Sequence, residues 1–298
     1  MTDRFHPFSP ARVRTLAMST VTQLLRMRII VFLAVFCAIV VAAAFAFPVM
    51  NPEQQLKLLK DVSFGALQLF SLIVAIVATS LLLPRDVEDR TLYTILAKPV
   101  PRLDYLVGKL LGVLVVIGGG LIVMDAVFSI VLWSRQQMVL ADSIAGLMHD
   151  HHGRVPEEAL AALRADVGRQ GLTWSLHIGV WAIFCKAAVL ASLALLISCF
   201  ATSTLFTVIT TFCFTVLGHG EGMLRDYFLR GGVGSWEYAL SAFVAVICPD
   251  LSLFDAVDAV VAGKVLSLDN LAFMTGIGAL YVVGYTTVAY LLFVEKEL

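Results

Sequence analysis

The chain has 298 residues, of which 59% are hydrophobic and 14% are charged, and its mean hydropathy is +0.90. This composition excludes an ordinary soluble globular protein and predicts an all-α integral membrane protein. The formal net charge of −1 argues against a partner made of nucleic acid, because a nucleic-acid-binding protein normally carries a basic surface. The five cysteines lie in or beside apolar runs without a CxxC pair, so neither a disulfide framework nor a zinc site is expected.

An amphipathic helix is predicted before the first long apolar run. Ser9 and Pro10 are typical of a helix start, with serine as the N-cap and proline at the first helical position. Apolar residues between Val13 and Leu24 share one side of this helix, and arginines on both flanks suit lipid headgroups. We therefore expect residues 9–28 to lie in the membrane interface, with a solvated N-terminal tail as the alternative.

Six apolar segments are candidates for membrane-spanning helices. A bilayer core of about 30 Å requires roughly 20 apolar residues in a helix. Five segments meet this length, and a sixth is shorter but unbroken. A further apolar stretch, residues 237–248, is too short to span and predicts a short re-entrant or interfacial helix before the last span. The predicted spans are residues 29–48, 62–83, 106–133, 174–198, 204–218 and 271–294.

The distribution of lysine and arginine predicts the orientation. Residues 1–30 carry five arginines and residues 84–109 carry five basic residues, whereas residues 49–61 carry only two. Basic residues in short loops favour the cytoplasmic side. We expect a single transmembrane domain over residues 1–298 in the inner (cytoplasmic) cell membrane, with both termini and segment 84–105 cytoplasmic. The connectors at 134–173 and 219–270 are then extracytoplasmic.

The polar segment between the second and third predicted spans is more than a simple connector. Five of the six residues from Arg85 to Arg90 are charged, three apolar residues follow at helical spacing, and prolines at 99 and 101 end the pattern. This arrangement predicts a short amphipathic helix at the membrane surface, suited to docking on a soluble partner. A solvated loop that serves only the topology is the alternative.

Motifs for catalysis are absent from the sequence. There is no GxxxxGK[ST] phosphate-binding loop, no HExxH zinc motif and no GxSxG nucleophile motif. We therefore expect no enzyme activity and no cofactor in this chain itself. His149, His151 and His152 are the only metal-like cluster, and their near-contiguous spacing favours a solvated polar loop over a weak metal contact.

Two ionisable residues lie inside the predicted spans. Asp125 is in the third span and Lys186 is near the middle of the fourth, with a depth difference of roughly 8 Å at 1.5 Å per residue. Charges at such depth are costly and usually find partners within the bundle. We expect these two residues to pair and to hold adjacent helices together, with a substrate-facing polar patch as the alternative.

The cytoplasmic segment resembles the membrane subunits of type-2 ABC exporters. The shared features are acidic residues, a Thr-Leu pair, a Leu-x-x-Pro-Val-x-Arg run and a Gly-Lys pair at the entry to the next span, although the family often has glycine where Arg90 stands. Here they are Asp86, Glu88, Arg90-Thr91-Leu92, Leu96 to Arg102, and Gly108-Lys109. The N-terminal amphipathic helix, the region from Pro249 to Phe254 and the C-terminal stretch from Phe293 to Glu297 are also similar to that family.

The resemblance implies a permease subunit that couples to a separate ATPase, which would bind ATP and magnesium and be present in two copies. It also implies that a second permease subunit forms a homodimer with this chain. Export would then follow a pathway between the two subunits, whose outer helices contact membrane lipid. Its coupling helix would contact the ATPase through Asp86, Glu88, Arg90, Thr91 and Tyr93. An extracytoplasmic gate would include His219, Glu221, Arg225, Trp236 and Glu237. The alternatives are a secondary transporter and a structural membrane assembly protein without ATPase coupling.

Overall fold

The computed structural model describes seven stretches of the chain: residues 9–26, 29–45, 52–82, 101–150, 155–201, 203–229 and 248–295. All regular secondary structure in these stretches is helical. The expected all-α class is therefore confirmed for the described residues. The predicted coupling segment and most of the predicted short helix at 237–248 lie outside them.

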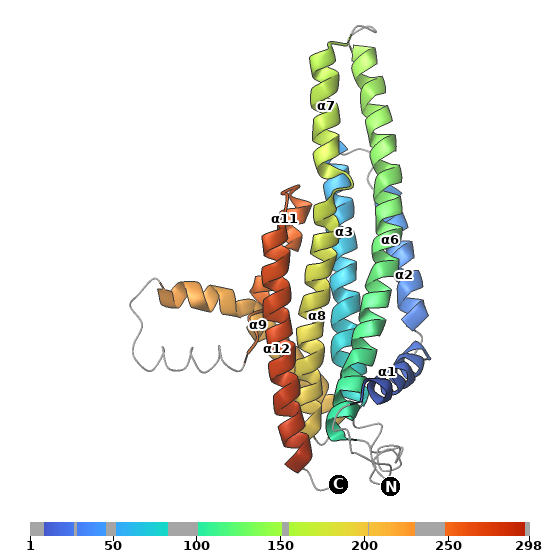
Figure 1. Ribbon diagram of the computed structural model, residues 1–298. Coiled ribbons are helices and arrows are strands. Elements are labelled where there is room, and N and C mark those ends of the chain that lie inside the picture. The colour runs from blue at the N-terminus through green and yellow to red at the C-terminus, as the bar shows by residue number, and fades with distance from the viewer. Residues whose placement is uncertain are drawn as a thin grey trace.

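Four long helices run side by side and form an elongated bundle (Figure 1). They are α3 (Pro52–Ile73), which continues through a π-helical turn, η1 (Val74–Ala78), to Leu82, together with α6 (Arg102–Asp150), α8 (Trp174–Phe200) and α12 (Leu268–Glu295). All four are long and apolar enough to cross a membrane.

Two further helices correspond to the first and fifth predicted spans. Helix α2 (Ile29–Phe45) and helix α9 (Thr204–Leu229) contain shorter apolar stretches of 10–17 residues. The membrane character of the protein thus rests on the four long helices, and the count of six spans stays a prediction.

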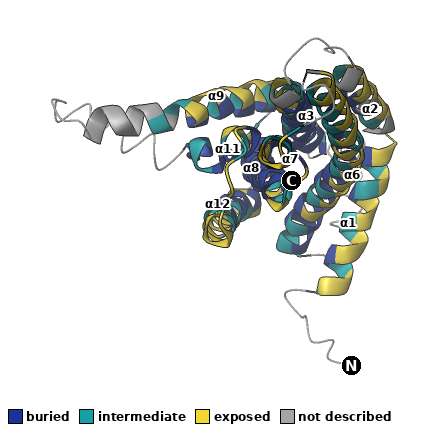
Figure 2. Cartoon of the chain, turned by 90° about the horizontal axis from the view of Figure 1, so that it is seen from above, coloured by how far each residue is buried: buried dark blue, intermediate teal, exposed yellow. Residues whose placement is uncertain are grey.

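Helix α8 is the centre of the bundle. Of its 27 residues, 21 are buried, and Figure 2 shows the other helices arranged around it. In its most apolar stretch 78% of the residues are buried, against 22% in that of α12. Alanines and serines between Ala182 and Ser198 give α8 a slim profile, which lets neighbouring helices approach closely. Helix α12 packs along α8 on one side and leaves a wide apolar face exposed on the other.

Helix α6 does not end where the apolar run ends at residue 133. It has 49 residues, or about 74 Å at 1.5 Å per residue, more than twice the thickness of a bilayer core. No proline interrupts it, and the first one after it is Pro156. Helix α7 (Glu157–Gln170) packs back against α6, so that much of the predicted connector 134–173 is a helical hairpin that extends beyond α12 (Figure 1).

Helix α1 (Pro10–Leu25) packs across the first part of α6. Its start agrees with the prediction, with Ser9 as the N-cap residue and proline in the first turn. Two glycines of α6, one turn apart, allow the close approach: a Cβ atom on Gly108 would lie 2.6 Å from Leu16 Cβ, and one on Gly112 would lie 2.5 Å from Thr20 Cβ. Small residues at this spacing are a common device of membrane helix packing.

Two short helices connect α9 to α12. The 3-10 helix η2 (Leu251–Phe254) packs on α8 and α9, and α11 (Val257–Val261) packs on α8 and α3. Asp250 caps η2, because its carboxylate accepts a hydrogen bond of 3.0 Å from the backbone N–H of Ser252. This connection lies against the central helix and brings polar residues to it.

Candidate functional site

The predicted contacts to an ATPase lie outside the described residues. Asp86, Glu88, Arg90, Thr91 and Tyr93 all fall between Leu82 at the end of the α3 helix and Pro101 before α6. The described residues on either side of this segment are the end of the α3 helix and the start of α6. The start of α6 makes polar contacts with two other helices.

Asp104 fastens the start of α6 to the start of α1. Its side chain is 0% exposed, and its Oδ2 atom lies 2.9 Å from Arg12 Nε and 3.3 Å from the backbone nitrogen of Ser9, both of which donate hydrogen bonds. A carboxylate in the first turn is also favoured by the positive end of the helix dipole. The other oxygen, Oδ1, is buried and has no hydrogen-bond partner among the described residues.

Arg102 fastens the same turn of α6 to the end of α12. Its Nη1 atom donates hydrogen bonds of 2.7 Å to the backbone carbonyl oxygens of Phe293 and Val294, which are among the last carbonyls of that helix. The guanidinium group also lies over the Phe293 ring at 5.8 Å, and Tyr105 stacks on that ring at a centroid distance of 6.1 Å. A cation suits this position, because the C-terminal end of a helix is negative.

These contacts form a basal joint, which we define as Ser9, Arg12, Arg102, Asp104 and Phe293. It brings together the start of α1, the start of α6 and the end of α12, at one end of the bundle (Figure 1). Sequence reasoning identified Arg102 only as a basic residue of the family motif and missed Asp104. The sequence signal that could have identified Asp104 is an acidic residue in the first turn of an apolar helix that begins directly after a proline.

The two intramembrane charges do not pair with each other, so that prediction is wrong. Lys186 Nζ lies 2.6 Å from Asp255 Oδ1, and Asp125 Oδ2 lies 2.8 Å from His177 Nδ1. The reason lies in the connection between η2 and α11, which packs against α8 and carries Asp255 to the depth of Lys186. His177, near the start of α8, takes the position opposite Asp125 in the antiparallel helix.

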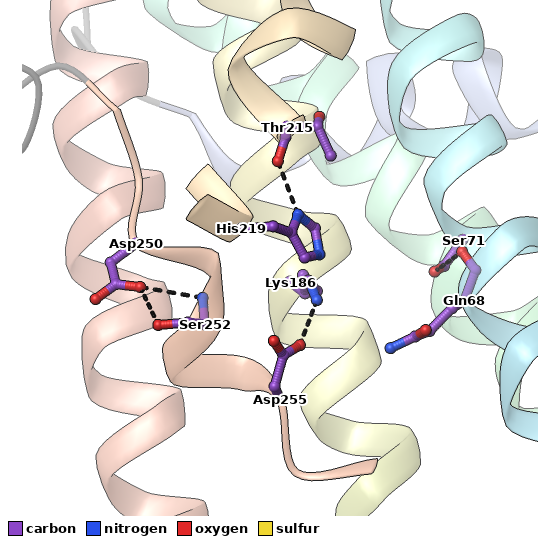
Figure 3. A network of polar contacts seen from close by, with 8 residues as sticks. All are labelled: Gln68, Ser71, Lys186, Thr215, His219, Asp250, Ser252 and Asp255. Carbon is purple, nitrogen blue, oxygen red and sulfur yellow. Dashed lines mark hydrogen bonds and ion pairs between the residues drawn. The ribbon is translucent and has the colours of Figure 1, made fainter. Parts of the chain in front are cut away.

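A cavity of about 310 Å³ lies beside Lys186, between α3, α8 and α9. Gln68 and Ser71 from α3 and His219 from α9 line it together with apolar side chains, as Figure 3 shows for the polar members. His219 Nδ1 lies 2.7 Å from the carbonyl oxygen of Thr215. Since a carbonyl oxygen only accepts, Nδ1 carries a proton and donates this hydrogen bond.

The predicted outer gate is described only in part. Helix α9 continues past residue 218, and its exposed residue His219 lines the cavity beside Lys186. Glu221 and Arg225 belong to α9, but their side chains lie outside the described residues, as do Trp236 and Glu237 altogether.

The three histidines that were considered as a possible weak metal contact, against the favoured solvated loop, are described only in part. His149 is exposed in the last turn of α6, while His151 and His152 lie outside the described residues. No group of three metal-ligating side chains occurs within the described ranges.

Polar contacts at the far end of the bundle join the hairpin of α6 and α7 to α3. Lys60 Nζ donates to Gln170 Oε1 at 2.6 Å, and Arg135 Nη2 donates to Gln55 Oε1 at 2.9 Å. Sequence reasoning missed these pairs, because each joins residues 80 or more positions apart. They hold the extended hairpin against the spanning helices.

Comparison with models of known protein families and with curated proteins finds no match for this chain. The functional argument therefore rests on the residues themselves.

Proposed function

We propose that this chain is the permease subunit of an ATP-binding cassette exporter, which forms the transmembrane pathway and couples through segment 84–105 to a separate ATPase. The four long apolar helices supply the membrane domain that such a subunit needs. The motif between Asp86 and Lys109 supplies the resemblance. The observation that carries the proposal further is the basal joint, because two of its residues, Arg102 and Asp104, lie at the end of segment 84–105.

The joint gives this segment a mechanical connection to the bundle. A force on the segment acts on α6 at Arg102, and the contacts of Arg102 and Asp104 pass it to α12 and α1. Packed helices respond to such forces as rigid bodies that shift between discrete arrangements. Charges on a docking helix fix its register on the partner. Because the basal joint connects α1, α6 and α12, closure of an ATPase would move these three helices of the permease together.

The proposal includes the partners and the orientation. Two copies of the ATPase would bind ATP and magnesium, and a second permease subunit, in the simplest case an identical one, would complete the pathway. Both termini and the coupling segment would face the cytoplasm at the inner membrane. This chain would not hydrolyse ATP by itself.

Affinity purification followed by an ATPase assay tests the proposal. The tagged full chain is isolated from its native membrane in a mild detergent, and the eluate is assayed for a co-purifying ATPase and its activity. The variant Glu88→Arg reverses a charge in the coupling segment. The control Glu157→Arg makes the same reversal on an exposed residue of α7, at the opposite end of the bundle.

A co-purifying ATPase that is lost from Glu88→Arg and retained by Glu157→Arg is the expected result. Recovery of the chain without any nucleotide-hydrolysing partner would refute the proposal. Equal retention by both variants would refute the assignment of segment 84–105 as the contact.

A secondary transporter is the second candidate, and the Lys186–Asp255 pair beside the cavity favours it. Ionisable pairs inside a membrane domain are typical of ion-coupled carriers. In that case uptake into vesicles of the purified chain alone would follow a proton or sodium gradient. An exporter subunit without its ATPase would show no such transport, and neither would an assembly protein.

A further inference from the structure

We propose that the cavity between α3, α8 and α9 binds the acidic headgroup of an amphiphile, a carboxylate or phosphate ester carrying an apolar chain. Lys186 is the principal donor, and Asp255 is an internal competitor that the ligand displaces. This inference does not depend on the proposed coupling to an ATPase, because binding is measured on the chain alone.

Lys186 has unused hydrogen-bonding capacity. An ammonium group has three N–H donors, and one of them is directed at Asp255. No second hydrogen bond to Lys186 is found in the described stretches, although its side chain is only 10% exposed. A buried donor without a partner is costly, so the remaining N–H groups favour an acceptor that enters the cavity.

Gln68 and His219 add complementary groups on the facing walls. Gln68 extends from α3 toward Lys186 and His219 (Figure 3), and its side-chain amide has no hydrogen bond within the described residues. The amide offers further N–H donors, and His219, whose Nδ1 is bonded to Thr215, offers its second ring nitrogen to a ligand hydroxyl. An anionic oxygen is the strongest acceptor for such donors.

The rest of the lining is apolar and fits a hydrocarbon chain. Leu69 and Leu72 from α3 face the cavity opposite Ile183 and Leu190 from α8. A volume of about 310 Å³ is at the lower end of the range of small-molecule sites, which combine apolar walls with a few convergent polar groups. It suits a headgroup with the first part of its chain.

The ion pair explains how a negative headgroup enters an apolar bundle. Asp255 is 42% exposed while Lys186 is 10% exposed, so the carboxylate is the partner that reaches solvent more easily. If the ligand replaces Asp255, Lys186 keeps one counter-charge throughout. Removal of Asp255 should therefore strengthen binding, whereas removal of Lys186 should weaken it. A purely structural ion pair predicts no such opposite effects.

Photo-crosslinking with a diazirine-bearing fatty acid tests the proposal. The purified full chain, in nanodiscs of phosphatidylcholine, is titrated with this probe or with an alcohol of the same chain, and labelled peptides are identified by mass spectrometry. The acid is expected to label peptides of α3, α8 and α9 at a concentration at least about tenfold lower than the alcohol, because its bond to Lys186 is charge-assisted.

Five variants, of which Lys60→Met and Gly119→Leu are controls, test the direction of each expected change. Lys186→Met should require at least about tenfold more acid, and Asp255→Asn should require several-fold less. Lys60→Met, which removes another buried lysine that does not line the cavity, should not change labelling. Gly65→Leu should block the cavity without removing a charge, since a Cβ atom there meets nothing within 4 Å. Gly119→Leu is its matched control on α6, with the same open surroundings.

Circular dichroism and size-exclusion chromatography confirm that each variant is folded. Equal labelling by acid and alcohol would overturn the proposal. Unchanged labelling of Gly65→Leu, or weaker binding to Asp255→Asn, would also overturn it. Phosphatidylglycerol as a competitor separates the two sources of the ligand: competition identifies a membrane phospholipid, and competition only by free fatty acid identifies a smaller amphiphile. Both results support the site.

Discussion

Replacement of Gly112 by alanine is expected to weaken the packing of α1 on α6. A Cβ atom at this position would lie 2.5 Å from Thr20 Cβ and 2.8 Å from the carbonyl oxygen of Ala17, whereas ordinary contacts begin at 3.4 Å. The oxygen belongs to the backbone and cannot turn aside. Helix α1 must therefore move outward by roughly 1 Å, or the Gly112 region of α6 must distort.

The magnitude follows from comparison with Gly119→Ala on the same helix. Overpacking of this kind costs about 1–3 kcal/mol, while alanine is favoured over glycine in a helix by up to about 1 kcal/mol. A Cβ atom on Gly119 meets nothing within 4 Å, so that variant receives only the helix-forming benefit. The two variants should thus differ by about 1–3 kcal/mol in the free energy of unfolding.

Thermal unfolding of the purified chain in detergent measures this difference. A loss of 1 kcal/mol lowers Tm by about 2–4 °C for chains near this size, so the two variants should differ by roughly 2–12 °C. Gly108→Ala should fall between them, because its nearest backbone atom, the oxygen of Val13, is 3.2 Å away. A Gly112→Ala variant as stable as Gly119→Ala would refute the close crossing of the two helices.

Three further changes test other contacts. Asp104→Ala should lower the free energy of unfolding by about 1–3 kcal/mol, because Arg12 loses its buried partner. Thermal unfolding measures this loss, and Asp104→Asn should show a smaller one. In a double-mutant cycle, Lys186→Met and Asp255→Asn together should cost about 1–3 kcal/mol less than the sum of the single losses, and simple additivity would contradict the ion pair. Gly263→Ala should cost about 1–2 kcal/mol, because φ is 76° at this residue, and unchanged stability in the same melting assay would contradict that backbone conformation.

Hydrophobic runs were sufficient to predict where helices lie but not where they end. The predicted spans 174–198 and 271–294 fall within α8 and α12, because both helices are apolar almost throughout. In contrast, α6 continues for 17 residues beyond the predicted end at residue 133. The end of an apolar run does not by itself end a helix, and no proline, which would interrupt one, occurs between Arg102 and Pro156.

The polar contacts were harder to predict, because they depend on the three-dimensional path of the connections. The depth of Lys186 was predictable from its position in an apolar run, and so was its need for a partner. Asp255 was not identifiable as that partner, since it lies in a segment that sequence alone places outside the membrane. The buried Asp104 had no local signal beyond its position in a first helical turn.

The unbroken course of α6 also has a geometric consequence. A rigid rod of about 74 Å that pivots at its base by about 5° moves its far end by roughly 6 Å. Arg102 and Asp104 sit at the pivot, and the tip lies in the hairpin with α7, beyond the end of α12 (Figure 1). A small rotation at the basal joint would thus become a displacement of several ångströms at the tip of the hairpin. The tip of the hairpin would therefore respond to the position of the basal joint at the opposite end of the helix.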